Sequence, residues 1–290
     1  MIIGITGNYR KEEFYPLLER VHTLISSQGY PVLISSDLVK NTEYHIPSNY
    51  EVVDFSEFID KCTLVCAIGG DGTILSTVRR MEQKMIPVMG IHIGGLGFLS
   101  ECTEENLESS LEHVFNKEYS ISHRMMLEVK VKSENGKDEI FYALNDIVID
   151  HGPTGRVLKA EVQVSGHYLN TYEGDGVIIA TPTGSTAYSL SAGGPIIYPS
   201  VETILVTPIC PHSLSARPIV LQRDEEITMR FPDPFDGIAL TVDGQTRITV
   251  DNDSRIKISR SKYPAQLVSL PSNGYFKTLR TKMGWSGNVR

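Results

Sequence analysis

Two hydrophobic patterns divide the chain near residue 121. Before this point, short apolar runs alternate with stretches whose apolar residues recur at helical spacing. The runs predict strands at 2–6, 31–35, 64–68 and 86–92. The helical stretches are 14–27, 55–61, 74–81 and 104–116, and a polar loop is expected at 36–54. Strands that alternate with helices predict a doubly wound parallel sheet, whose ligands bind beyond the carboxyl ends of the strands.

After residue 121 the predicted segments are short, alternate apolar with polar residues and are separated by turn signals. Ser133 to Lys137 and Ser165 to His167 are hairpin signals. The predicted strands are 126–132, 139–149, 159–164, 168–172, 177–181, 226–231, 238–243, 247–251, 256–261 and 266–270. This series predicts an all-β second domain of β-sandwich-like build.

The expected organisation is an α/β domain over 1–120, an all-β domain over 121–270 and a tail over 271–290. The tail carries a helical pattern from Phe276 to Gly284. We expect this helix to pack back on the N-terminal domain.

Composition excludes several classes of partner. The net charge of −8 argues against bulk nucleic-acid binding, which depends on Lys and Arg. No apolar run approaches the roughly 20 residues of a membrane span. Met1 to Gly7 is a predicted strand without the basic leader of a signal peptide, so the cytoplasm is the expected location. The four cysteines form no metal-ligand pattern.

The stretch Gly69-Gly-Asp-Gly-Thr73 follows a buried run and precedes a helical pattern. Its glycines let a ligand approach backbone N–H groups, and the start of a helix favours phosphate. A carboxylate at Asp71 repels phosphate, which indicates another task, such as taking a proton from an attacking hydroxyl. The alternative is a structural turn in which Asp71 caps the helix. For this motif alone, both interpretations stay open.

A second group of candidate residues lies in the predicted β domain. Glu173 to Pro195 runs from a buried strand into a loop of glycines and small hydroxyl residues, which suits a planar or ribose-bearing ligand. Within it, Tyr188 could stack on a ring or donate a hydrogen bond. The alternative is a serine-rich surface loop. Asn145 and Asp146 interrupt an apolar strand, where they need a partner inside the protein or a ligand hydroxyl.

Together these stretches closely resemble the ATP-NAD kinase family, from Ile5 to Gln245. The matching motifs are Gly69 to Thr73, Leu96 to Leu99, Asn145-Asp146, Gly174 to Pro195, Pro211 to Pro218 and Asp243 to Gln245. The first is shared with diacylglycerol and sphingosine kinases, whereas Thr181 to Pro195 is far more specific. The resemblance implies an α/β domain of the GGDGT-kinase type and phosphorylation of the adenosine-ribose 2′-hydroxyl of NAD to give NADP. A lipid kinase and a non-catalytic NAD(P)-binding sensor are the alternatives.

The resemblance also implies roles for individual residues. Asp71 would be the general base, Gly72 would lie against the nucleotide, and Asn145 with Asp146 would bind the adenosine part. The NAD site would be lined by Asp175, Thr186, Ala187, Tyr188, Ser189, Leu190 and Ser191, and Arg156 and Gln245 fall at binding positions.

The family uses ATP, and in some members polyphosphate, together with Mg²⁺ or another divalent cation, and it forms homodimers or homotetramers. Lys and Arg are scarce in the motifs, so we expect a metal held by the phosphates and no dedicated protein cage. The chain departs from the family at two positions. Asp146 stands where a glutamate is usual, which shortens its reach to ribose. Glu173 stands where a basic residue is common, so a phosphate contact from that position is not expected.

Overall fold

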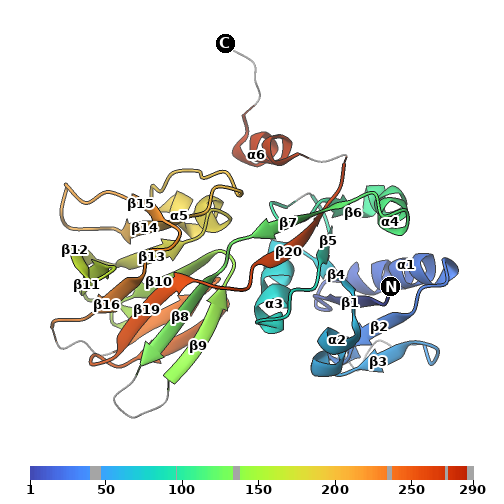
Figure 1. Ribbon diagram of the computed structural model, residues 1–290, viewed down its shortest axis with the longest axis horizontal. Helices are drawn as coiled ribbons and strands as arrows, with labels where there is room; N and C mark the ends of the chain where they lie inside the picture. The colour runs from blue at the N-terminus through green and yellow to red at the C-terminus, as the bar shows by residue number, and fades with distance from the viewer. Residues whose placement is uncertain (40–46, 96, 133–137, 234–236, 272–273, 286–290) are drawn as a thin grey trace. The chain divides into compact units, whose positions relative to one another are not determined.

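The computed structural model describes residues 1–39, 47–95, 97–132, 138–233, 237–271 and 274–285. The chain forms two compact units (Figure 1). The first comprises Met1–His123 and Ala265–Arg290, and the second comprises Arg124–Pro264. Each unit has its own hydrophobic core.

The first unit is built on one sheet with the strand order β3-β2-β1-β4-β5-β20-β7, and β6 pairs with β5. The strands are β1 (Ile3–Gly7), β2 (Val32–Ser35), β3 (Glu51–Val53), β4 (Leu64–Gly69), β5 (Val88–His92), β6 (Cys102–Thr103), β7 (Ser120–Arg124) and β20 (Ala265–Ser269). The pairs from β3 through β5 are parallel. All six residues of β4 are buried, as expected for a central strand covered on both faces.

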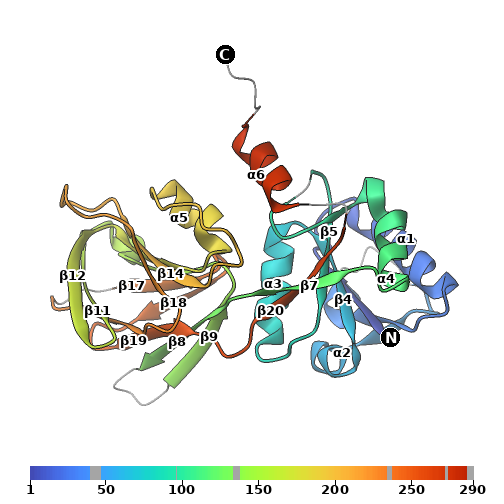
Figure 2. The same cartoon turned by 45° about the horizontal axis from the view of Figure 1, so that its top comes forward.

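The first unit also contains helices, and those that precede residue 120 contact strands of the sheet. The helices of this unit are α1 (Phe14–Ser27), α2 (Phe55–Lys61), α3 (Asp71–Met81), α4 (Leu107–Phe115) and α6 (Tyr275–Met283), with short 3₁₀ turns at Ser36–Val39 and Glu104–Asn106. The Asp54 carboxylate caps α2 by accepting from the Glu57 N–H at 2.9 Å. α1 and α4 lie side by side (Figure 2), where Arg20 and Glu108 form a bidentate ion pair.

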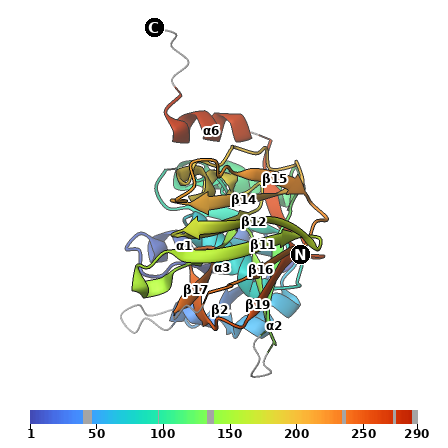
Figure 3. The ribbon, with the colours of Figure 1, turned by 90° about the vertical axis from the view of Figure 1, so that its left-hand side faces the viewer.

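The second unit has two six-stranded sheets, ordered β15-β14-β13-β10-β17-β18 and β12-β11-β16-β19-β8-β9. Figure 3 shows β12, β11, β16 and β19 as neighbouring strands of the second of these sheets. The strands are β8 (Leu127–Lys132), β9 (Asp138–Ala143), β10 (Asp146–Asp150), β11 (Leu158–Val164), β12 (His167–Gly174), β13 (Gly176–Ala180), β14 (Thr203–Ile209), β15 (Ile219–Gln222), β16 (Ile227–Arg230), β17 (Ile238–Val242), β18 (Thr246–Val250) and β19 (Arg255–Arg260). Short turns of helix follow β10 and β13, at Gly152–Thr154, Gly184–Thr186 and α5 (Tyr188–Ser191).

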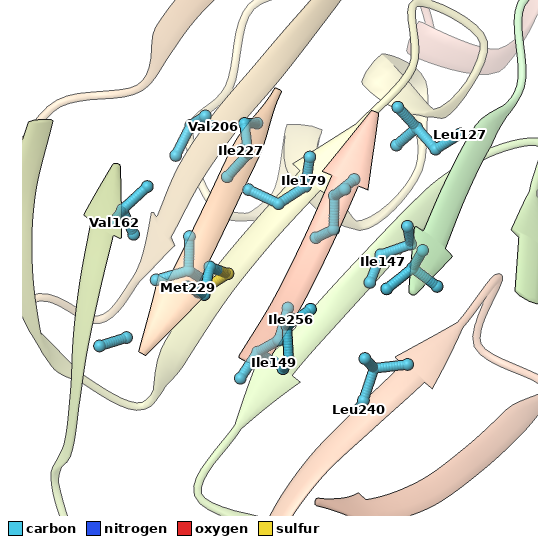
Figure 4. Close-up of a cluster of buried hydrophobic side chains, with 14 of the residues drawn as sticks. Leu127, Ile147, Ile149, Val162, Ile179, Val206, Ile227, Met229, Leu240 and Ile256 are labelled. Carbon is cyan, nitrogen blue, oxygen red and sulfur yellow. The ribbon is translucent and has the colours of Figure 1, made fainter. Parts of the chain in front are cut away.

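Side chains along the strands of the β15-β14-β13-β10-β17-β18 sheet point alternately to its two faces, so its apolar residues fall into two clusters. Ile147 and Ile149 of β10 join residues of both sheets in the main core (Figure 4). Val148, between them, belongs to a separate cluster on the opposite face with Ile178 and Leu205. Side chains at i and i+2 of a strand share a face, so Asp146 and Asp150 lie on the face of Val148.

The predicted fold class, an α/β unit followed by a β-sandwich-like unit, is confirmed. Some assignments differ. The predicted strand 266–270, assigned to the β domain, corresponds to β20, which belongs to the sheet of the first unit, where Leu267 pairs in parallel with Val88. The predicted strand 139–149 is two strands, β9 and β10. β3 lies in the predicted loop 36–54, and β14 and β15 were not predicted. The hairpin turn at 133–137 and Leu96 lie outside the described residues.

Candidate functional site

The glycine turn between β4 and α3 gives the first unit a backbone-built site. Gly70 is the residue before α3 and makes no side-chain cap, and the Thr73 N–H bonds to its carbonyl at 2.9 Å. A Cβ on Gly69 would collide with the Thr73 side chain, so the turn requires glycine there. α3 therefore directs the positive end of its dipole at the carboxyl edge of the sheet, as phosphate binding requires.

Asp71 begins α3, and its carboxylate reaches across to a second glycine-rich segment. Oδ2 accepts from the Phe98 N–H at 2.8 Å, and Oδ1 accepts from the Leu99 N–H at 3.1 Å. A Cβ on Gly97 would collide with this carboxylate. Two backbone donors thus fix the carboxylate, and the lone pairs they leave can accept a proton.

Basic groups from three distant segments lie near this turn. Lys11 Nζ donates to the Ile93 carbonyl at 3.3 Å, and His92 pairs with Gly69 in the sheet. Burial lowers the pKa of His92; the charge of Asp71 opposes this shift, and the charges of Lys11 and Lys282 add to it. The scarcity of Lys and Arg within the motifs is therefore partly offset by residues that the fold brings together.

In the second unit, Asp243 organises the start of β10. Its carboxylate accepts three backbone N–H groups, from Leu144 at 3.1 Å, Asn145 at 2.7 Å and Asp146 at 3.1 Å. Its backbone has a φ of 49°, in the left-handed region that Asp tolerates better than most residues. The turn Asp243-Gly244 thereby holds Asn145 and Asp146 in place.

Asp146 is 4% exposed and lies beside Asp243, so its charged form is disfavoured. Burial first, and then the charge of Asp243, raises its pKa to about 7, although a backbone hydrogen bond from Tyr188 acts in the opposite direction. Near neutral pH this carboxyl can therefore both donate and accept hydrogen bonds.

The loop after β13 packs against the same turn. The Thr181 N–H donates to the Asn145 carbonyl at 2.8 Å, and the Thr181 hydroxyl donates to the Leu144 carbonyl at 2.6 Å. The Gly184 N–H donates a hydrogen bond to the Thr181 hydroxyl at 3.1 Å, and a Cβ on Gly184 would collide with the Asn145 carbonyl. The small residues of this loop therefore serve close packing, and they hold Ala187 and Tyr188 beside Asp146.

Two neighbouring cavities lie on this face of the second unit. The first, of about 260 Å³, is lined in part by Asn145, Asp146, Ala187, Tyr188, Asp243 and Arg247. The second, of about 280 Å³, is lined in part by Asp150, His151, Asp175, Tyr188 and Arg247. Among the charged side chains of both linings, carboxylates outnumber arginine, which suits the hydroxyl groups of a sugar.

The predicted residues fall into three groups. Asp71 and Gly72 form the turn of the first unit. Asn145, Asp146, Asp175, Ala187 and Tyr188 line the two cavities. Neither of these cavities is lined by Arg156, Thr186, Ser189, Leu190, Ser191 or Gln245. Ser189 is buried with its hydroxyl 2.8 Å from that of Thr207, so its visible role is structural.

Sequence reasoning missed four residues here: Thr181, Asp243, Asp150 and Arg247. Asp243 belongs to the motif Asp243 to Gln245, in which the sequence predicts a binding role for Gln245 alone. Asp150 and Arg247 carry no motif signal and meet only through strand register. A β-strand prediction that included register could have found them.

Comparison with known proteins identifies the family. The model of the ATP-NAD kinase N-terminal domain matches residues 3–119, and that of the C-terminal domain matches 144–270. An NAD kinase of Geotalea daltonii is 38% identical over 93% of both chains. An NAD kinase of Clostridium botulinum is 44% identical over 76% of this chain and 78% of its own.

Solved structures of an NADH kinase and an NAD kinase have a similar fold. Yeast NADH kinase complexed with NADH has a TM-score of 0.90 and 27% identity, covering 100% of this chain and 89% of that one. An Archaeoglobus fulgidus NAD kinase in complex with ATP has the same fold, with a TM-score of 0.76 at 23% identity, over 98% of this chain and 99% of that one. The fold and the family models are those of nucleotide-binding phosphotransferases. The chain belongs to the ATP-NAD kinase family, and it is an enzyme that acts as a kinase on NAD. No helix in the described part of the chain is long and apolar enough to cross a membrane.

Proposed function

We propose that the chain transfers the γ-phosphoryl group of ATP to the 2′-hydroxyl of the adenosine ribose of NAD, with Asp71 as general base. The observation that carries the role of Asp71 is its carboxylate, held by the Phe98 and Leu99 N–H groups beside the glycine turn. Asp71 takes the proton from the hydroxyl as the ribose oxygen attacks the γ-phosphorus. The bond from that phosphorus to the β–γ bridging oxygen breaks, and ADP leaves.

The donor phosphates would bind at the Gly69–Thr73 turn, where Gly72 lies and where the N-terminus of α3 favours negative charge. Lys11, which hydrogen-bonds to Ile93, and the nearby Lys282 would add positive charge, while the lowered pKa of His92 leaves that imidazole neutral and able to donate a hydrogen bond. ATP would enter as its Mg²⁺ complex, in which the cation neutralises the phosphate charge. The phosphates and water would supply most of the ligands of this cation, as is usual for Mg²⁺.

The acceptor would bind the carboxylate-lined cavities of the second unit. Asn145 and Asp146 would contact the adenosine ribose, and Asp175 and Tyr188 would line the rest of the NAD site. Thr186, Ala187, Ser189, Leu190 and Ser191 would shape the loop, and Arg156 and Gln245 remain predicted binding positions. A homodimer or homotetramer and a cytoplasmic location also stay predictions. Light scattering on purified protein tests the former.

A coupled assay tests the reaction. Purified protein is mixed with NAD, ATP and Mg²⁺, and NADP is detected with an NADP-specific dehydrogenase. We expect NADP from the wild type, and turnover lower by about 10²- to 10⁴-fold in Asp71→Asn with NAD binding largely retained. Equal turnover in the variant would remove Asp71 from the mechanism. If the wild type binds NAD but makes no NADP, polyphosphate as donor and NADH as acceptor are tried next. Failure of these too would leave the sensor alternative.

A further inference from the structure

The two cavities of the second unit share three residues. Asp150, Tyr188 and Arg247 line both of them. Asn145 and Asp146 lie in the first cavity only. Asp175 lies in the second only. The shared residues therefore stand between two sites, each of a size to accept part of a dinucleotide.

Arg247 is fixed in this position by the sheet. It lies on β18 opposite Thr241 of β17, which in turn pairs with Val148 of β10. Its guanidinium forms a bidentate pair with Asp150, with Nη2 to Oδ1 at 2.8 Å and Nη1 to Oδ2 at 3.1 Å. Nη1 also donates to the Thr241 hydroxyl at 3.1 Å.

This anchoring leaves part of the guanidinium available. Arginine has five N–H donors, and three are used, so Nε–H and one Nη2–H have no partner within the described residues. The Asp150 side chain is 20% exposed and that of Arg247 is 52% exposed. The less exposed Asp150 thus holds the guanidinium in place, and Arg247 has two N–H groups left for a ligand in the cavities that it lines.

Charge in the linings explains why this arginine matters. Asp146 and Asp243 line the first cavity, Asp175 lines the second, and Asp150 lines both. Among the described residues that line either cavity, Arg247 is the only lysine or arginine. Carboxylates accept hydrogen bonds from ribose hydroxyls but repel phosphate, so Arg247 is the favoured contact for an anionic ligand group, and His151 is the other basic side chain that lines the second cavity.

We infer that Arg247, held by Asp150, binds the pyrophosphate that joins the two halves of the dinucleotide, an inference that rests on the proposed function. The adenosine half lies on the Asp146 side and the nicotinamide riboside half on the Asp175 side. Arg247 thereby supplies the phosphate contact that Glu173 cannot make. Glu173 faces Lys159 instead, at 3.5 Å.

Binding measurements with three probes test this role: NAD, ADP-ribose, which keeps the pyrophosphate, and adenosine, which has none. Arg247→Gln is expected to weaken binding of NAD and ADP-ribose by about 10- to 100-fold, the usual effect of losing a charged hydrogen bond. Adenosine binding, followed by NMR titration, should change less than twofold. Arg247→Lys, which keeps the charge without the planar fork, should give intermediate affinities.

Arg255→Gln is the matched control, because Arg255 is an exposed arginine of the same unit that lines neither cavity. Equal loss of adenosine and NAD binding in Arg247→Gln would mean that the arginine only maintains the shape of the sheet face. Unchanged NAD binding would also overturn the inference. Binding is measured apart from turnover, so a wild type that binds NAD and ADP-ribose but makes no NADP would contradict the proposed function alone.

Discussion

The two sites are built in opposite ways. The turn at Gly69–Thr73 presents backbone and a helix terminus, and the cations near it come from distant segments. The face around Asp146 presents carboxylates from β10 and from turns beside it, with one arginine among the described residues that line its cavities. Backbone N–H groups and a helix dipole suit phosphate, whereas carboxylates suit hydroxyl groups. The contrast matches a reaction in which one substrate brings a triphosphate and the other brings a ribose.

Gly97→Ala probes the backbone-built site most strongly. The new Cβ would collide with the Asp71 carboxylate and displace it from the Phe98 and Leu99 N–H groups. A displacement of about 1 Å at a catalytic group costs about 100-fold in rate, or about 2.7 kcal/mol in the barrier. We expect kcat for NADP formation to fall by that order while the melting temperature changes by only a few degrees.

Gly95→Ala is the matched control in the same segment, because a Cβ there meets nothing within 4 Å. Its kcat should stay within twofold of the wild type. Equal kcat in both variants would show that the position of the Asp71 carboxylate does not limit the rate.

Local patterns in the sequence predicted the fold class and most strands, because β4, β13 and their neighbours bury continuous apolar runs. They could not place β20. Its residues, Ala265–Ser269, read like any other strand of the β domain, and only pairing with the distant β5 puts it in the first sheet. Partner choice between strands far apart in sequence is a tertiary property.

The candidate sites divide in the same manner. Motifs identified Asp71 and Asn145-Asp146, because the candidate functional residues there are consecutive or nearly consecutive in the sequence. Asp150 and Arg247 are 97 positions apart and meet through the register of β10, β17 and β18. Lys11, His92 and Lys282 likewise come from separate segments. A local pattern carries no information on such pairs.

Asp146 makes the stability of the carboxylate-built site depend on pH. Its folded pKa, about 7, exceeds the unfolded value near 3.8, so the native state binds more protons between these values. Its contribution to stability is present below the unfolded pKa and is lost as pH rises through 7. In urea titrations without nucleotide, the unfolding free energy should fall by roughly 2 kcal/mol from pH 5 to pH 7 on account of this residue.

Asp146→Asn should remove this part of the pH dependence. The difference in unfolding free energy between the variant and the wild type should therefore change with pH. Asp253→Asn, at an exposed carboxylate, should leave the wild-type slope unchanged. Parallel pH profiles for wild type and Asp146→Asn would rule out a raised pKa at this position.

Lys11→Gln tests the smallest expected effect, the contribution of a single cation to the backbone-built site. Lys11 is partly exposed and hydrogen-bonds the Ile93 carbonyl, so solvent screens its charge. We expect KM for ATP to rise about three- to tenfold, the effect of roughly 1 kcal/mol, with KM for NAD unchanged. Lys117→Gln, at an exposed lysine of the same unit, should change neither constant. A rise in KM for NAD alone would assign Lys11 to the acceptor site. It would then contradict the proposal that the Gly69–Thr73 turn binds the donor and the cavities around Asp146 bind the acceptor.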